Sequence, residues 1–238
     1  MWWNMAPEHR ADFEDWHTHE HFPERLGVPG FRRASRWTRA DGGEGVFVLY
    51  ELESHATLSS PAYLARLNAP TPWSTRLMPH HRNMVRGQTR VLQSLGAVIA
   101  RRALTLRLSP APGKAQALQA ALQSLMAGIA ATPGFAGAHL LQHETPRIPQ
   151  TTEQRIRGAA DQVADWVLVV CAYDTQALEA FAANELSASA LEALGATTGS
   201  VQAIYELACS ATPDDVPCTK QEGTGLGGRD EGHPGDRS

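Results

Sequence analysis

The chain has few cysteines, no excess of charge of either sign and no long apolar run. Its 238 residues include three cysteines, 21 lysines and arginines, and 25 aspartates and glutamates, which gives a formal net charge of -4. Without a basic excess, nucleic acid is not an expected partner. Without a long apolar run or a signal peptide, we expect neither a membrane span nor export. Cys171, Cys209 and Cys218 follow no metal-binding or paired spacing, so we expect reduced thiols in a cytoplasmic protein.

Three common catalytic motifs are also missing. The sequence has no phosphate-binding glycine loop between a strand and a helix, no Gly-x-Ser-x-Gly nucleophile elbow and no Cys-x-x-Cys pair. These absences argue against nucleotide, serine-hydrolase and dithiol chemistry.

The sequence does contain one pattern twice. A helical run followed by Pro-Gly-Phe and a strand occurs at Gly27 to Phe31 and again at Ala131 to Phe135. Downstream of each copy an apolar strand leads into a second helix, at residues 46–50 and 166–170, and the second copy carries the longer loop. Such a repeat indicates a duplicated βαββαβ unit.

The elements expected from periodicity and turn signals fill two such units. Helices are predicted over 8–26, 60–68, 114–131 and 175–194, and strands over 31–39, 46–52, 86–94, 103–108, 135–142, 166–172 and 200–209. Residues 69–84 and 144–162 are expected to be irregular, each with a short helix or helical turn.

The sequence therefore predicts an α+β protein with three parts. Residues 1–97 and 98–210 are expected to form two ferredoxin-like units that pack sheet to sheet as an intramolecular α/β-barrel, and residues 211–238 a disordered tail. Only Met1 to Met5 precede the first helix. Either the opening strand is very short, or the true start of the chain lies upstream.

Two histidines on the first helix are the strongest candidates for catalysis. His17 and His21 are four residues apart, so both imidazoles can face one pocket and exchange protons with a substrate. Glu20 could orient a ring nitrogen, whereas His19 should face solvent. Such a pair is also half a metal site, but no spacing demands a third ligand, so no metal is expected. The alternative is that one histidine packs under the sheet and the others are solvated.

A second group of polar residues lies at His80-His81-Arg82-Asn83. A loop rich in these side chains can bind a carboxylate or phenolate, with the arginine making a bidentate contact. The alternative is a capped surface turn. Tyr50 and Trp73 could line a pocket for a flat substrate, although aromatic residues are more often part of a core.

The first unit resembles the EthD-type branch of the dimeric α/β-barrel superfamily. The resemblance rests on Phe13, Trp16-His17, His21-Phe22-Pro23 and Pro29-Gly30-Phe31. It implies an aromatic pair on the first helix, with Trp16 beside the substrate, and a His-x-Pro motif in which His21 is the histidine. The helix over 121–131 contains no histidine, so the second unit should have a degenerate site.

These features support several functions. The leading hypothesis is a cofactor-independent isomerase, cyclase or lyase that acts on an aromatic, lactone or polyketide-like metabolite. His21 would be its acid or base, His17 the partner and Arg82 an anion clamp. A cofactor-independent monooxygenase is a variant within the same class of enzyme. The alternative is a non-catalytic binding or stress-responsive protein. We expect a small-molecule substrate and either a monomer with a pseudo-dimeric barrel or a homodimer.

Overall fold

The computed structural model describes residues 1–158 and 162–216. The first unit consists of β1 (Trp2–Asn4), α1 (Pro7–Trp16), the π-helical turn η1 (His17–His21), α2 (Phe22–Leu26), β2 (Phe31–Arg39), β3 (Gly45–Leu52), the short helix η2 (His55–Ser59), α3 (Pro61–Asn68), α4 (Pro72–Leu77), η3 (Met78–His80) and β4 (Arg82–Arg86). After β5 (Thr89–Gly96), the second unit consists of β6 (Arg102–Leu108), α5 (Ala115–Ala130), β7 (Phe135–His143), α6 (Thr152–Arg157), β8 (Gln162–Val163), β9 (Trp166–Ala172), α7 (Thr175–Asn184), α8 (Ala188–Ala193), β10 (Val201–Ala211) and η4 (Pro213–Asp215).

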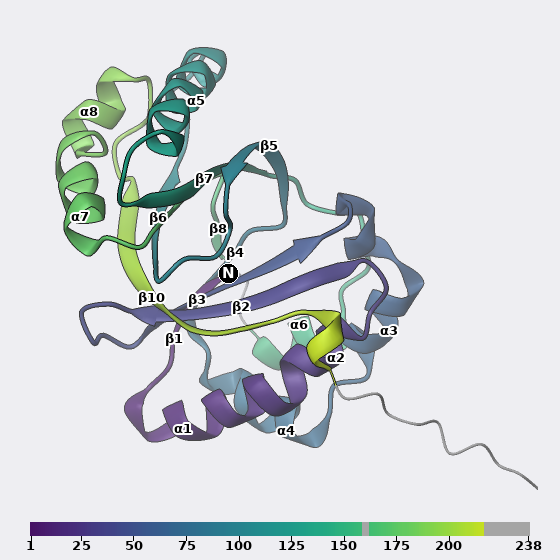
Figure 1. The fold of residues 1–238 in the computed structure, drawn as a ribbon. Helices are drawn as coiled ribbons and strands as arrows, with labels where there is room; N and C mark the ends of the chain where they lie inside the picture. The colour runs from purple at the N-terminus through teal and green to yellow at the C-terminus, as the bar shows by residue number, and fades with distance from the viewer. Residues whose placement is uncertain (159–161, 217–238) are drawn as a thin grey trace, which may run out of the picture.

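The strands form one sheet in which both units have the ferredoxin-like order. The complete order is β5-β7-β9-β6-β10-β2-β3-β1-β4-β8. β10 joins the units, because it pairs with β6 through its first half and with β2 through its second half. Only Gly87 and Gln88 separate β4 from β5 in the sequence. β5 pairs with β7, so this short connection joins strands near opposite ends of the strand order. The predicted α+β fold with an intramolecular barrel is confirmed (Figure 1).

Three apolar clusters follow from the alternation of side chains along the strands. One lies between the helices and the sheet of the first unit, a second between α5, α7, α8 and the sheet of the second unit, and a third inside the barrel. Neighbouring residues of β1 show the alternation, since Trp3 belongs to the first cluster and Trp2 to the barrel interior.

The opening strand is short, as predicted. β1 pairs with β3 over only three residues, Trp2 to Asn4 against Gly45 to Phe47, and it also pairs with β4. β6, which has the same place in the second unit, pairs with β9 over seven residues. The sheet beside the second half of β3 is therefore not covered by β1.

Several predicted boundaries were wrong. The strand expected over 86–94 is two strands, since β4 pairs within the first unit and β5 with the second unit. The helix expected over 175–194 is α7 and α8, because Ser187 begins a new helix by accepting a hydrogen bond from the backbone N–H of Ala190.

The predicted tail begins later than expected. Ala211 is the last residue of β10 and pairs with Ala34, and Val216 packs against the apolar cluster of the first unit. The rest of the expected tail, including Cys218, lies outside the described residues.

The two Pro-Gly turns of the repeat have the same geometry. Gly30 has φ 94° and Gly134 has φ 96°, and a Cβ would lie 2.6 Å from Thr57 Oγ1 in the first turn and 2.9 Å from Ala177 Cβ in the second. Both turns therefore require glycine for conformation and for space.

We expect Gly30→Ala to lower the free energy of unfolding by about 1–3 kcal/mol, because alanine would be strained at this positive φ. Gly128→Ala is the matched control, since Gly128 lies in α5 with no atom within 4 Å of the added Cβ. It should stabilise the protein by about 0.5–1 kcal/mol. Urea denaturation measures both; equal effects of the two substitutions would contradict the expectation.

Candidate active site

The two candidate histidines lie on a π-helical turn rather than on a regular α-helix. The backbone N–H of Phe22 donates to His17 O, five residues earlier. Pro23 follows at once, has no N–H to donate and would crowd the carbonyl of residue 19 in a regular α-helix. The wider turn relieves this conflict, and such turns are frequent at functional sites.

This turn brings the two imidazoles together in a buried place. The ring centroids of His17 and His21 are 5.3 Å apart, and the residues are 2% and 7% exposed. His19 on the same turn is exposed, as expected. The prediction that both candidate rings share one face, away from His19, is confirmed.

A third imidazole comes from the end of η3. The His81 ring lies 4.9 Å from Trp3 and 6.0 Å from Trp16, centroid to centroid. Within the described part of the chain, neither ring nitrogen of His81 has a hydrogen-bond partner, and the same holds for Nδ1 of His17 and of His21. The nearest carboxylate oxygen to His21 Nδ1 is Glu24 Oε2 at 3.8 Å. These nitrogens are therefore buried without a partner among the described residues that a bound molecule would have to displace.

All three rings are neutral near pH 7. Burial, followed by the positive charges of Arg36 and Arg25, holds the pKa of His17 and of His21 well below the ordinary value. Burial and Arg157 lower the pKa of His81 to about 3. Neutral imidazole has one nitrogen lone pair free to accept a proton, so the cluster can act as a base.

The second unit supplies part of the wall around these rings. The long loop after β7 carries α6, which packs against α3 and η3 of the first unit (Figure 1). Glu153 of α6 is 3% exposed and binds the buried guanidinium of Arg25. Burial alone would lower the pKa of Arg25, but Glu153 and other nearby acidic groups outweigh it and raise this pKa. The repeat predicted a longer loop in the second unit. This loop, which follows β7, therefore forms part of the site of the first unit.

A cavity of about 510 Å³ joins these groups. On the helix side of the sheet it is lined by Trp16, His17, His21, Tyr50, His81 and Arg157. On the barrel side it is lined by Leu49, Ser94, Val98, His139, Leu141 and Val169. It reaches both sides because β1 pairs with β3 only from Gly45 to Phe47 and leaves the second half of β3 without that neighbour.

Five predicted site residues line this cavity: Trp16, His17, His21, Tyr50 and His81. The hydroxyl of Tyr50 is buried without a partner in the described part of the protein, and burial raises the pKa of Tyr50.

The other five predicted residues lie elsewhere. Glu20 does not orient an imidazole, because Glu20 Oε1 accepts from Trp16 Nε1 at 3.0 Å and from Thr71 Oγ1 at 2.5 Å. Trp73 Nε1 donates to Asp12 Oδ1 at 2.9 Å, outside the cavity. His80, Arg82 and Asn83 do not line the cavity either.

Three members of the 80–83 group point away from His81. The His80 ring lies 3.7 Å from the His9 ring, and exposed Arg82 pairs with Glu44 at 2.6 Å. Asn83 lines a different cavity, and it has φ 54°. His80 and His81 precede β4, and Asn83 adopts a positive φ where the strand begins, so these neighbours in sequence separate in space. Arg82 is not among the residues that line the cavity of the three imidazoles, whose lining includes Arg25, Arg86 and Arg157.

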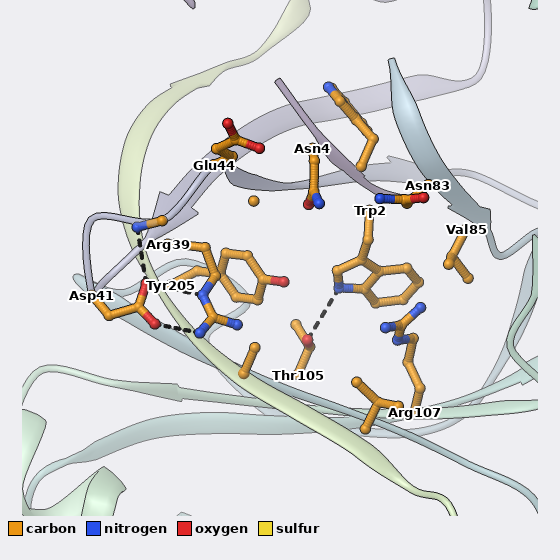
Figure 2. A pocket seen from close by; sticks show the side chains of 15 residues that line it. Trp2, Asn4, Arg39, Asp41, Glu44, Asn83, Val85, Thr105, Arg107 and Tyr205 are labelled. Atoms are coloured by element: carbon orange, nitrogen blue, oxygen red, sulfur yellow. Dashed lines mark hydrogen bonds and ion pairs between the residues drawn. The ribbon is translucent and has the colours of Figure 1, made fainter. Parts of the chain in front are cut away.

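The different cavity has about 650 Å³ and opens on the barrel side of β1 (Figure 2). Its polar groups largely satisfy one another. Trp2 Nε1 donates to Thr105 Oγ1 at 3.1 Å, and the guanidinium of Arg107 lies 5.2 Å from the centre of a Trp2 ring. Arg39 Nε donates to Asp41 at 3.1 Å. With Arg39 paired to Asp41 and Glu44 paired to Arg82, this cavity is the weaker candidate for catalysis.

The described residues provide neither a cluster of metal ligands nor an ionised thiol at Cys171. No group of three or more His, Cys, Asp or Glu residues in the described ranges could hold a metal ion. Cys171 Sγ donates to Val98 O at 3.0 Å, and burial raises the pKa of this thiol to about 12. The described helices include none long and apolar enough to cross a membrane.

Comparison with known proteins supports the fold. No protein-family model matches the chain, and no curated protein matches it. An anthrone oxidase-like protein of known structure is 12% identical, with a TM-score of 0.59 over 89% of this chain and 91% of the other. Provisionally named monooxygenases of Fusobacterium nucleatum and Lactobacillus acidophilus are 7% and 10% identical, with TM-scores of 0.56 and 0.54 over 89% of this chain and 91% and 93% of theirs.

The chain thus shares the ferredoxin-like α/β-barrel fold of these proteins. At such identities the likeness concerns the fold alone. The EthD-type resemblance of the first unit stays a prediction.

Proposed function

We propose that this protein is an enzyme that transfers a proton on an aromatic, lactone or polyketide-like metabolite. The observation that carries the proposal is the cluster of three buried, neutral imidazoles whose unpaired nitrogens line one cavity. His21 is the acid or base, and His17 and His81 share the proton.

The charge around the cluster supports this chemistry. The arginines that lower the imidazole pKa values create a positive potential in the cavity. The same potential stabilises the enolate or phenolate that forms when a base removes a proton. The ring of Trp16, 4.5 Å from His21, provides a flat apolar wall for a ring-shaped substrate.

Cofactor-independent oxygenation is the second candidate. The same proton removal gives a carbanion, which can react with dioxygen without a bound cofactor. This candidate is favoured by the three proteins of the same fold that are named as oxidase-like or as monooxygenases. A non-catalytic binding protein is the remaining alternative, in which the rings only bind a ligand.

Anthrone in deuterated water is a suitable probe, because exchange of its acidic C–H reports proton removal whatever step follows. His21→Ala should slow the enzyme-dependent exchange, measured by NMR, by about 10²–10⁴-fold. His17→Ala should lower it by a smaller factor in the same range. Oxygen consumption in the same sample separates oxygenation from isomerisation.

His19→Ala is the control, since His19 lies on the same turn but is exposed. It should leave the exchange rate unchanged. If His21→Ala binds anthrone and exchanges it as fast as the unmodified protein, the proton-transfer proposal is wrong.

A further inference from the structure

The barrel side of the cavity contains a serine and a histidine in direct contact. Ser94 of β5 and His139 of β7 are opposite each other in the antiparallel pairing, and both side chains line the cavity. Ser94 Oγ lies 2.7 Å from His139 Nδ1. Ser94 is exposed and His139 is 4% exposed, so the hydroxyl can be reached while the imidazole behind it is shielded.

The other ring nitrogen of His139 fixes the direction of this hydrogen bond. His139 Nε2 lies 3.1 Å from Ala97 O. A carbonyl oxygen can only accept, so Nε2 carries the proton and Nδ1 has the free lone pair. The Ser94 hydroxyl therefore donates to Nδ1. This is the arrangement of an activated nucleophile: a hydroxyl on a base, and the base oriented by a third group.

The electrostatic state of His139 fits the role of a base. Burial lowers the pKa of His139, and the hydrogen bond to Ala97 O opposes this effect. The ring is neutral near pH 7 and can take the serine proton. The carbonyl of Ala97 then stabilises the imidazolium through Nε2–H.

The walls around the pair indicate the kind of substrate. Leu49, Val98, Leu141 and Val169 line the barrel side of the cavity with apolar surface. We propose that Ser94 and His139 form a nucleophilic dyad that cleaves carboxylic esters with an apolar acyl group. This activity is separate from proton transfer at the helix side of the sheet.

The reaction balances with these groups and water alone. Ser94 Oγ bonds to the ester carbonyl carbon while its proton moves to His139 Nδ1. The bond from that carbon to the alcohol oxygen breaks, and the alcohol leaves with the proton from Nδ1. Water, deprotonated by the same nitrogen, then releases the carboxylic acid and restores the serine.

The test uses the full chain with p-nitrophenyl butyrate and a fluorophosphonate, which forms a stable bond to an activated serine as fluoride leaves. The unmodified protein should hydrolyse the ester and carry the label on Ser94, as located by peptide mass spectrometry. Ser94→Ala and His139→Asn should each lower hydrolysis at least about 10²-fold. His139→Asn keeps a polar group near the serine but cannot act as a base.

Ser189→Ala is the matched control, because Ser189 is an exposed serine of α8 far from the pair in sequence. It should leave hydrolysis and labelling unchanged. Absence of label on Ser94 in the unmodified protein would overturn the proposal. This result does not depend on whether the variants fold. Hydrolysis that persists at full rate in either Ser94→Ala or His139→Asn would also overturn it.

Discussion

Replacing Glu153 by alanine should lower the free energy of unfolding by about 3–5 kcal/mol, because the buried guanidinium of Arg25 loses its closest carboxylate and keeps only the more distant Glu24, at 3.6 Å. Glu153 binds Arg25, and these side chains are 4% and 3% exposed. Arg157 Nη1 lies 3.7 Å from the same carboxylate and would lose that contact as well. Urea denaturation followed by circular dichroism measures the change.

Two variants control this experiment. Glu185→Ala removes an exposed glutamate just after α7 and should change stability by no more than about 0.5 kcal/mol. Replacing Arg25 and Glu153 together by methionine and leucine should cost less than Glu153→Ala, since the buried guanidinium of Arg25 is removed together with its closest carboxylate. A loss below about 1 kcal/mol for Glu153→Ala would mean that α6 does not dock on the first unit in solution.

Acid should destabilise the protein below about pH 6.5, through the buried histidines. His17, His21 and His81 have pKa values below the ordinary one in the folded protein, so the unfolded chain binds protons that the folded chain does not. Stability is then unaffected above the unfolded pKa and falls as the pH drops below it. Each ring contributes up to about 1.4 kcal/mol per pH unit until its own folded pKa is reached.

The contribution of one ring can be isolated with His81→Phe. Burial raises the pKa of Glu24, which acts in the opposite direction and makes the total slope smaller than the sum over the rings. Glu24 is present in both the unmodified protein and His81→Phe. Its effect therefore cancels when the slopes of unfolding free energy against pH are subtracted. Unfolding free energies at pH 7.5, 6.0 and 5.0 should show the shallower slope in His81→Phe, and no change in the exposed control His19→Gln. An unchanged slope in His81→Phe would show that this ring is protonated when folded.

Local patterns in the sequence were sufficient for the frame of the fold. The alternation of apolar residues located β2 and β9 to the residue, and the repeated Pro-Gly turns revealed two units of the same topology. The spacing of His17 and His21 placed both on one face. These features depend on neighbours a few residues apart, which is the range over which periodicity and turn chemistry act.

The composition of the site was decided by contacts between distant parts of the chain. Nothing near Glu153 indicates that it binds Arg25, because their meeting depends on where the loop after β7 docks. Of the group at 80–83, His81 lines one cavity and Asn83 lines another, because the chain passes from η3 into β4 at this point and Asn83 adopts a positive φ.

The serine and histidine of the barrel interior are the clearest case. The absence of a nucleophile elbow argued against serine chemistry, yet Ser94 and His139 meet because β5 leaves the first unit and pairs with β7 of the second. A motif search reads residues that are close in sequence, whereas sheet register places residues side by side from any separation. The sequence by itself determined most of the strands, the two Pro-Gly turns and the paired histidines. Tertiary structure alone decided which side chains share the cavity, because burial, charge pairing and cross-strand contacts arise only when distant segments pack.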